Sequence, residues 1–109
     1  MITLVSFITR NPALSFDAFR THWIEVHAPL VRAGLPAMRG YRAHFEGGTR
    51  EGYALLDCDA IVELSFDSVD AMHAAMASAA FNTPERIASS ARLMGTATPR
   101  NMVLDTREA

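Results

Sequence analysis

A helical segment over residues 15–31 constrains the fold of this chain more than any other stretch. Its large apolar residues recur every three or four positions, which is the spacing of one face of an α-helix. They are Phe16, Phe19, Trp23, Val26, Leu30 and Val31. We therefore predict an amphipathic helix whose apolar face packs on the rest of the core.

His27 lies within this apolar face, one turn after Trp23. A buried imidazole needs a hydrogen-bond partner, or its pKa is shifted by the loss of water. Two residues later, Pro29 has no N–H to donate to the carbonyl of Glu25, and its ring crowds that carbonyl. We therefore predict that the helix kinks, or stops and restarts, beside His27.

The composition indicates one compact domain with apolar surface to spare. Half of the 109 residues are hydrophobic, which is a high share for a domain of this size, so we expect a homodimer interface.

A net charge of −2 gives no attraction for nucleic acid or anionic lipid. The single cysteine, Cys58, cannot form an intrachain disulfide, which favours a cytoplasmic location. The apolar N-terminal stretch is too short for a membrane span, so no membrane contact is expected.

Alternation and capping signals predict the remaining elements. Residues 2–9 are apolar on both faces, as in a covered strand. Residues 39–46 and 59–66 alternate apolar and polar positions, as in antiparallel neighbours. A last strand is expected over 96–104, with Pro99 at an edge or bulge.

Two further helices follow the second of the alternating strands. Ser68 is the expected N-cap of a helix over 69–79, whose apolar side is rich in alanine and methionine. Thr83 and Pro84 predict the start of a short helix that Gly95 ends. Gly47-Gly48 and the polar run through Gly52 predict a loop that extends as far as Asp57, a length that is more often functional or mobile than filler.

This order of elements predicts an α+β, ferredoxin-like split βαβ fold, with helices on one face of a four-stranded antiparallel sheet. The other sheet face carries Val5, Phe7 and Ile61 beside polar residues and is too apolar to face water. We therefore predict that residues 1–109 form a single domain and that two sheets pack face to face in a dimeric α+β barrel.

Three segments resemble the EthD family of small dimeric α+β barrel proteins, in the family's order and spacing. They are Phe19-Arg20-x-x-Trp23-x-x-x-His27-Ala28-Pro29-Leu30-Val31, Gly40-Tyr41-Arg42 and Asp59-x-x-x-Glu63-Leu64-x-Phe66-Asp67-Ser68. The family is named for a component associated with bacterial ethyl tert-butyl ether degradation. The turn at Leu35-Pro36 departs from the Pro-Gly pair that relatives often have. The resemblance implies the fold and the dimer, and it implies an activity only broadly, because similar proteins include cofactor-independent isomerases, decarboxylases and oxygenases.

His27 and Tyr41 are the predicted catalytic residues. Tyr41 shares a strand face with Ala43 and Phe45, and if that face lies beneath the helix, the phenol reaches the imidazole. His27 would then act as base or acid, while Tyr41 orients it or stabilises an enolate-like oxygen. The alternative is structural, because a lone histidine in an apolar stripe is more often a satisfied core residue.

A small apolar pocket between helices and sheet is the predicted substrate site. Its expected lining is Trp23, Leu30, Met38, Met76 and Phe81. The same side chains equally suit a filled core, since methionine packs flexibly. No histidine pair has metal-ligand spacing beside a carboxylate, so neither a metal nor another cofactor is expected. Glu63 is expected to be a paired, buried charge in the barrel interior, for instance with an arginine of the partner strand.

The sequence therefore predicts a cytoplasmic homodimer that acts on a small hydrophobic or aromatic compound in a catabolic pathway. The expected reaction is a cofactor-independent proton transfer, as in an isomerase or a decarboxylase. Two alternatives remain open at this point. One is a non-catalytic accessory protein that binds such a compound for a partner oxygenase, and the other is a haem-binding protein with His27 as axial ligand.

Overall fold

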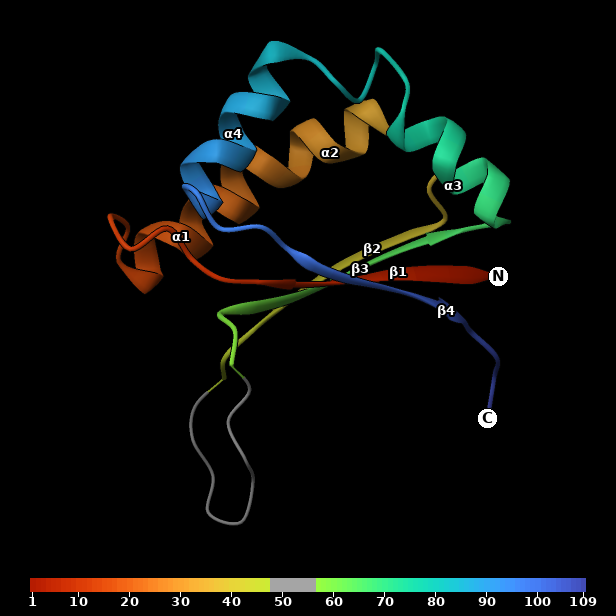
Figure 1. Ribbon diagram of the computed structural model, residues 1–109, viewed down its shortest axis with the longest axis horizontal. Helices are drawn as coiled ribbons and strands as arrows, with labels where there is room; N and C mark the ends of the chain where they lie inside the picture. Colours follow the sequence, from red (N-terminus) through yellow and green to blue (C-terminus); the bar gives the residue numbers. More distant parts are fainter. Residues whose placement is uncertain (48–56) are drawn as a thin grey trace.

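The computed structural model describes residues 1–47 and 57–109. In this part of the chain a four-stranded antiparallel sheet is covered on one face by helices (Figure 1). The strands are β1 (Ile2–Ile8), β2 (Gly40–Phe45), β3 (Ala60–Phe66) and β4 (Arg100–Asp105), and their order across the sheet is β2-β3-β1-β4. The predicted α+β, ferredoxin-like fold is confirmed. Most of the loop predicted over 47–57 lies outside the described residues.

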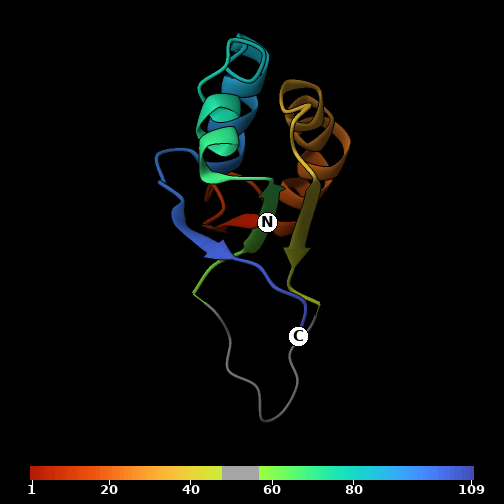
Figure 2. The ribbon, with the colours of Figure 1, turned by 90° about the vertical axis from the view of Figure 1, so that its right-hand side faces the viewer.

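One face of the sheet forms the floor of the core. Leu4 of β1 pairs with Leu64 of β3, and Tyr41 of β2 pairs with the same Leu64. Paired residues point to the same side of a sheet, so Tyr41 and Leu4 share a face. Tyr41 packs against the buried core cluster, and the helices lie over this face in both views (Figure 2). The strand face that carries Tyr41 thus lies beneath the helices, which is the condition on which the predicted contact with His27 depended.

The first helix is continuous but irregular, as Pro29 predicts. It consists of α1 (Phe16–His22), a single π-helical turn η1 (Trp23–His27) and α2 (Ala28–Gly34). In the π turn the N–H of Ala28 donates to the carbonyl of Trp23, five residues earlier. Pro29 follows in the first turn of α2, where a missing N–H costs little. The irregularity is a widened turn rather than a sharp kink.

The wider turn changes which side chains face the core. Val26 is 44% exposed, so its predicted place in the apolar face is wrong. A π turn holds an extra residue, so it rotates the residue three positions after Trp23 away from the core and aligns the residue four positions after it. His27 is that fourth residue, and it is buried. The predicted burial of Phe19 and Val31 is confirmed.

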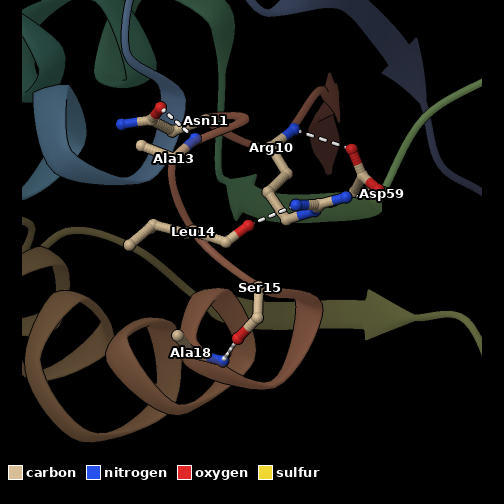
Figure 3. A network of polar contacts seen from close by, with 7 residues as sticks. All are labelled: Arg10, Asn11, Ala13, Leu14, Ser15, Ala18 and Asp59. Carbon is tan, nitrogen blue, oxygen red and sulfur yellow. Dashed lines mark hydrogen bonds and ion pairs between the residues drawn. The ribbon is translucent and has the colours of Figure 1, made fainter.

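The chain enters α1 through a tight polar turn, which Figure 3 shows from close by. The backbone N–H of Arg10 donates to Asp59 Oδ2 at 2.7 Å, and its guanidinium donates to the carbonyl of Leu14. Ser15 Oγ accepts from the N–H of Ala18 at 3.1 Å, so Ser15 is the N-cap of α1. These bonds fix the start of α1 relative to the residues that lead into β3.

Two further helices, α3 (Val69–Met76) and α4 (Pro84–Met94), complete the helical layer over the sheet. Ser68 and Thr83 cap them with side-chain oxygens, as predicted. Gly95 ends α4 at φ 59°, a left-handed conformation that favours glycine. Within the described ranges, no helix combines the length and the apolar content needed to cross a membrane.

The first helix and the connection between α3 and α4 lie in close contact at Gly34, the last residue of α2. A Cβ on Gly34 would lie 2.8 Å from the Cα of Phe81 and 2.9 Å from the carbonyl oxygen of Ala80. Real Cβ atoms do not sit this close to backbone, so glycine is required here. The close approach lets Phe81 pack in the core.

The opposite face of the sheet carries apolar side chains, as predicted. Val5 of β1 pairs with Met102 of β4, and Met102 is 53% exposed in the single chain. Glu63 on this face is paired, as expected, but with a histidine rather than an arginine. Its Oε2 lies 2.5 Å from His44 Nε2, and its side chain is 37% exposed. The reason is that residues diagonal on adjacent strands also reach each other.

Candidate functional site

Tyr41 lines an open cavity of about 300 Å³ at the junction of α2 and β2. The lining residues come from the end of α2, the connection that follows it and the start of β2. They are Arg32, Leu35, Pro36, Met38, Arg39, Gly40 and Tyr41. A helix end and a strand start thus bring cationic, apolar and phenolic groups to one place.

The predicted pocket residues divide between this cavity and the core. Met38 lines the cavity. Trp23 and Phe81 belong to the buried core cluster, and Met76 packs against it. Leu30 is half-buried on α2 and is not among the residues that line the cavity. The sequence therefore located one wall of the cavity and assigned several core residues to it.

The Tyr41 hydroxyl is held by Trp23. The indole Nε1–H donates to Tyr41 Oη at 3.0 Å. An indole has no acceptor, so the phenol oxygen accepts this bond and its own proton remains available for another partner. Edge-on contacts with Phe19 and Phe45, at ring-centroid distances of 5.6 and 6.3 Å, fix the orientation of Trp23.

The phenol of Tyr41 is protonated at neutral pH. Burial raises its pKa, against the smaller opposing effects of the Trp23 hydrogen bond and the charge of Arg32. The guanidinium carbon of Arg32 lies 5.4 Å from the centre of the Tyr41 ring, within cation–π distance. Tyr41 is therefore a neutral hydrogen-bond donor beside a fixed positive charge.

His27 is packed in the core rather than open to the cavity. Only 6% of its surface is exposed, and its ring lies edge-on to Trp23 with the centroids 4.9 Å apart. Its Nδ1 is hydrogen-bonded to Ser89 Oγ at 2.9 Å. Burial lowers the pKa of His27 to about 4, with further contributions from His22 and Arg86. The imidazole is neutral at pH 7, and this geometry agrees with the structural alternative.

A second imidazole, that of His22, shares the hydroxyl of Ser89. His22 Nε2 lies 2.9 Å from Ser89 Oγ, and the residue is half-buried. Residues five apart in an α-helix are about 140° apart around the axis. The π turn reduces this angle, so His22 and His27 face the same hydroxyl on α4. The sequence carries no signal for this cluster apart from the irregularity at Pro29.

His27 and Tyr41 are not paired with each other. Each has its own hydrogen-bond partner, Ser89 for the imidazole and Trp23 for the phenol. Trp23 contacts both rings, but its single N–H is a donor only and does not relay a proton between them. The axial-ligand interpretation needs an imidazole nitrogen that a haem iron can reach, and a histidine that is only 6% exposed gives it little support. Among the described residues, no group of three histidine, cysteine or carboxylate side chains is arranged to hold a metal ion.

Comparison with known proteins identifies the family. The EthD domain matches residues 11–86, which is most of the chain. The chain belongs to the EthD family. The match includes the first helix, β2, β3 and the start of α4, so it spans the cavity and the Trp23–Tyr41 pair. A comparison with curated proteins finds no match.

Solved structures agree with the EthD assignment. The EthD family protein of Bacillus halodurans C-125 has a TM-score of 0.69 at 22% identity, covering 98% of this chain and 99% of that chain. A dimeric ferredoxin-like protein of unknown function from Thermobifida fusca has a TM-score of 0.65 at 17% identity, covering 96% and 90%. SnoaB, a cofactor-independent oxygenase from Streptomyces nogalater, has a TM-score of 0.63 at 18% identity, covering 99% and 94%. Identities this low establish the fold and not the activity. The Thermobifida fusca protein is dimeric, and the homodimer of this chain stays a prediction.

Proposed function

We propose that this EthD-family protein binds a small hydrophobic or aromatic compound in the Tyr41 cavity and promotes a cofactor-independent proton transfer on it. Tyr41, rather than His27, is the group that contacts the reacting atoms. The observation that carries the proposal is the Trp23–Tyr41 hydrogen bond, because it fixes a neutral phenol with an unused proton in the wall of a cavity.

The chemistry follows from where charge develops. Removing a proton from a carbon beside a carbonyl places negative charge on the carbonyl oxygen, which becomes an enolate. A phenol O–H aimed at that oxygen stabilises the charge in a partly desolvated site. Reprotonation of the enolate at a different carbon completes an isomerisation. Loss of carbon dioxide from a β-keto acid forms the same enolate, which then gains a proton at carbon.

The walls of the cavity suit such a compound. Leu35, Pro36 and Met38 provide apolar contact, and about 300 Å³ is the lower end of the volumes that small-molecule sites have. The fold is also that of SnoaB, a cofactor-independent oxygenase. The analogy supports chemistry without a cofactor on this scaffold and does not identify the reaction.

A hydrogen–deuterium exchange assay tests the proposal. 2-Tetralone, a bicyclic aromatic ketone, is incubated with the protein in deuterated buffer, and loss of its α-proton signals is followed by NMR. The wild-type protein is expected to accelerate exchange over buffer. Tyr41→Phe, which keeps the ring and loses the donor, is expected to reduce the acceleration about 100-fold. Circular dichroism of both proteins establishes that the fold is unchanged. Exchange by Tyr41→Phe at the wild-type rate would refute the role of Tyr41.

One observation favours the non-catalytic alternative. The described residues that line the cavity include neither a carboxylate nor an imidazole, so the proton must leave to buffer or water rather than to a base in that lining. A binding protein for a partner oxygenase needs no base. The same assay separates the two functions, since a protein that binds the ketone without accelerating exchange is an accessory binder.

A further inference from the structure

Two arginines line the Tyr41 cavity, and their surroundings differ. The guanidinium of Arg39 donates to both carboxylate oxygens of Asp67, at 3.1 and 2.9 Å. This is a two-bond pair in which the charges compensate each other. Within the described part of the chain, no carboxylate lies within 4.0 Å of the Arg32 side-chain nitrogens. The cavity therefore holds one compensated and one uncompensated cation.

The position of Arg32 suits the binding of an anion. Its neighbours in the cavity are the ring of Tyr41 and apolar side chains, which leaves the planar fork of N–H donors available to a ligand. The protein as a whole carries a net charge of −2, so this local positive charge is not part of a generally basic surface. A guanidinium binds a carboxylate with two parallel hydrogen bonds, which gives direction as well as attraction.

We infer that the compound bound in the Tyr41 cavity carries a carboxylate and that Arg32 binds it. This inference rests on the proposed function for the location of the site and adds the chemical class of the ligand. Arg32 and Tyr41 stand side by side, with 5.4 Å between the guanidinium carbon and the ring centre. The ligand is accordingly a small aromatic or alicyclic acid whose reacting oxygen contacts the phenol while its carboxylate contacts the guanidinium.

Arg32 also lies in the last turn of α2, where a positive charge interacts favourably with the helix carbonyls. A purely structural arginine would affect the stability of the fold and would not distinguish one ligand from another. The test therefore compares two ligands of the same shape. 2-Naphthoate carries the carboxylate, and 2-naphthamide replaces it with a neutral planar group of nearly the same size.

Isothermal titration of the two probes decides the question. The wild-type protein is expected to bind 2-naphthoate about tenfold more tightly than 2-naphthamide, as a charge-assisted hydrogen bond provides. The preference is expected to diminish in high salt. Arg32→Met should remove the preference, because its affinity for 2-naphthoate should fall about tenfold more than its affinity for 2-naphthamide.

Arg20→Met is the matched control, because the guanidinium of Arg20 also lies over an aromatic ring, that of Phe16, but outside the cavity lining. This variant should keep the full preference for 2-naphthoate.

Three results would overturn the inference. They are equal binding of the two probes by the wild-type protein, an unchanged preference in Arg32→Met, and no binding of either probe. The ketone exchange assay separates this failure from failure of the proposed function. If exchange depends on Tyr41 and the carboxylate preference is absent, the enolate role stands and the ligand class is wrong. If the preference is present and exchange is not, the site binds acids without catalysis.

Discussion

The imidazole of His27 stays neutral because it is enclosed by Trp23 and bonded to Ser89, and burial lowers its pKa to about 4. In the unfolded chain the pKa of a histidine is near 6.5. Between these two values the unfolded state binds more protons than the folded state. The free energy of unfolding therefore falls as the pH is lowered from about 6.5 to about 4, and the loss ends below the folded-state pKa.

The first prediction concerns this pH dependence. Protonation linked to His27 alone should lower the free energy of unfolding by about 3 kcal/mol between pH 7 and pH 4. This figure takes about 1.4 kcal/mol for each unit by which the pKa is shifted. Urea unfolding across this range measures the loss. His27→Asn keeps a neutral group near the position of Nδ1 and should abolish this share of the slope. An identical slope in both proteins would show that the buried imidazole is not responsible.

The residue patterns predicted burial more successfully than they predicted contacts between particular side chains. Strand alternation grouped Tyr41 with Ala43 and Phe45 on one face, and helical spacing placed His27 and Trp23 in the core. The partner of His27 is Ser89, 62 residues away, and no local pattern encodes such a contact. Because His27 and Tyr41 lie on elements that pack together, a direct contact was a reasonable expectation. The indole of Trp23 fills the space instead.

At the scale of elements, the first helix packs closely against the backbone of the α3–α4 connection at Gly34. Gly34→Ala would place a methyl group against the backbone of residues 80 and 81, at 2.8 Å from the nearest atom. Overpacking of this kind costs about 1–3 kcal/mol, and a decrease of this size in the free energy of urea unfolding is expected. Gly40→Ala is the control, because its Cβ would meet only Ser65 Oγ at an ordinary 3.6 Å. Equal effects of the two substitutions would contradict the close approach.

The first helix shows that the sequence predicts the place of a helix irregularity but not its kind. The missing N–H of Pro29 predicted an irregularity beside His27, and the structure has one there. The kind of irregularity depends on the packing, since the π turn is the form that directs both His22 and His27 toward α4. Val26 was misplaced for this reason, because a regular helix was assumed through it.

For the whole molecule, the exposed apolar side chains of the open sheet face are the expected homodimer interface. Met102→Glu would place a charge in that interface opposite Val5, and a decrease of at least about tenfold in dimer affinity is expected, because an unpaired buried charge is costly. Analytical ultracentrifugation measures it. Ile24→Glu is a matched control, since Ile24 is also 53% exposed but lies on the helical side. A dimer that tolerates Met102→Glu as well as Ile24→Glu would use another surface.

Fold class was predictable at this scale because the order of strands and helices, their alternation and three cap residues all indicate one arrangement. The position of the cavity was not predictable, because the cavity lies where the chain passes from the end of α2 to β2. Its shape depends on the turn at Leu35-Pro36, which departs from the family pattern. Arg32 and Arg39 were absent from the predicted pocket, since exposed arginines on a helix and a turn carry no periodic signal.

The central claim is that Tyr41 stabilises an oxyanion in the cavity, and the ionisation of bound 4-nitrophenol tests it most directly. This phenol resembles an enolate in being planar and in sharing its negative charge with a conjugated system, and its absorbance reports the fraction ionised. We predict that binding lowers its pKa, that Tyr41→Phe restores the pKa toward the value in water, and that Trp23→Phe gives an intermediate value. A pKa that is unchanged or raised on the wild-type protein, or lowered equally by Tyr41→Phe, would contradict the account.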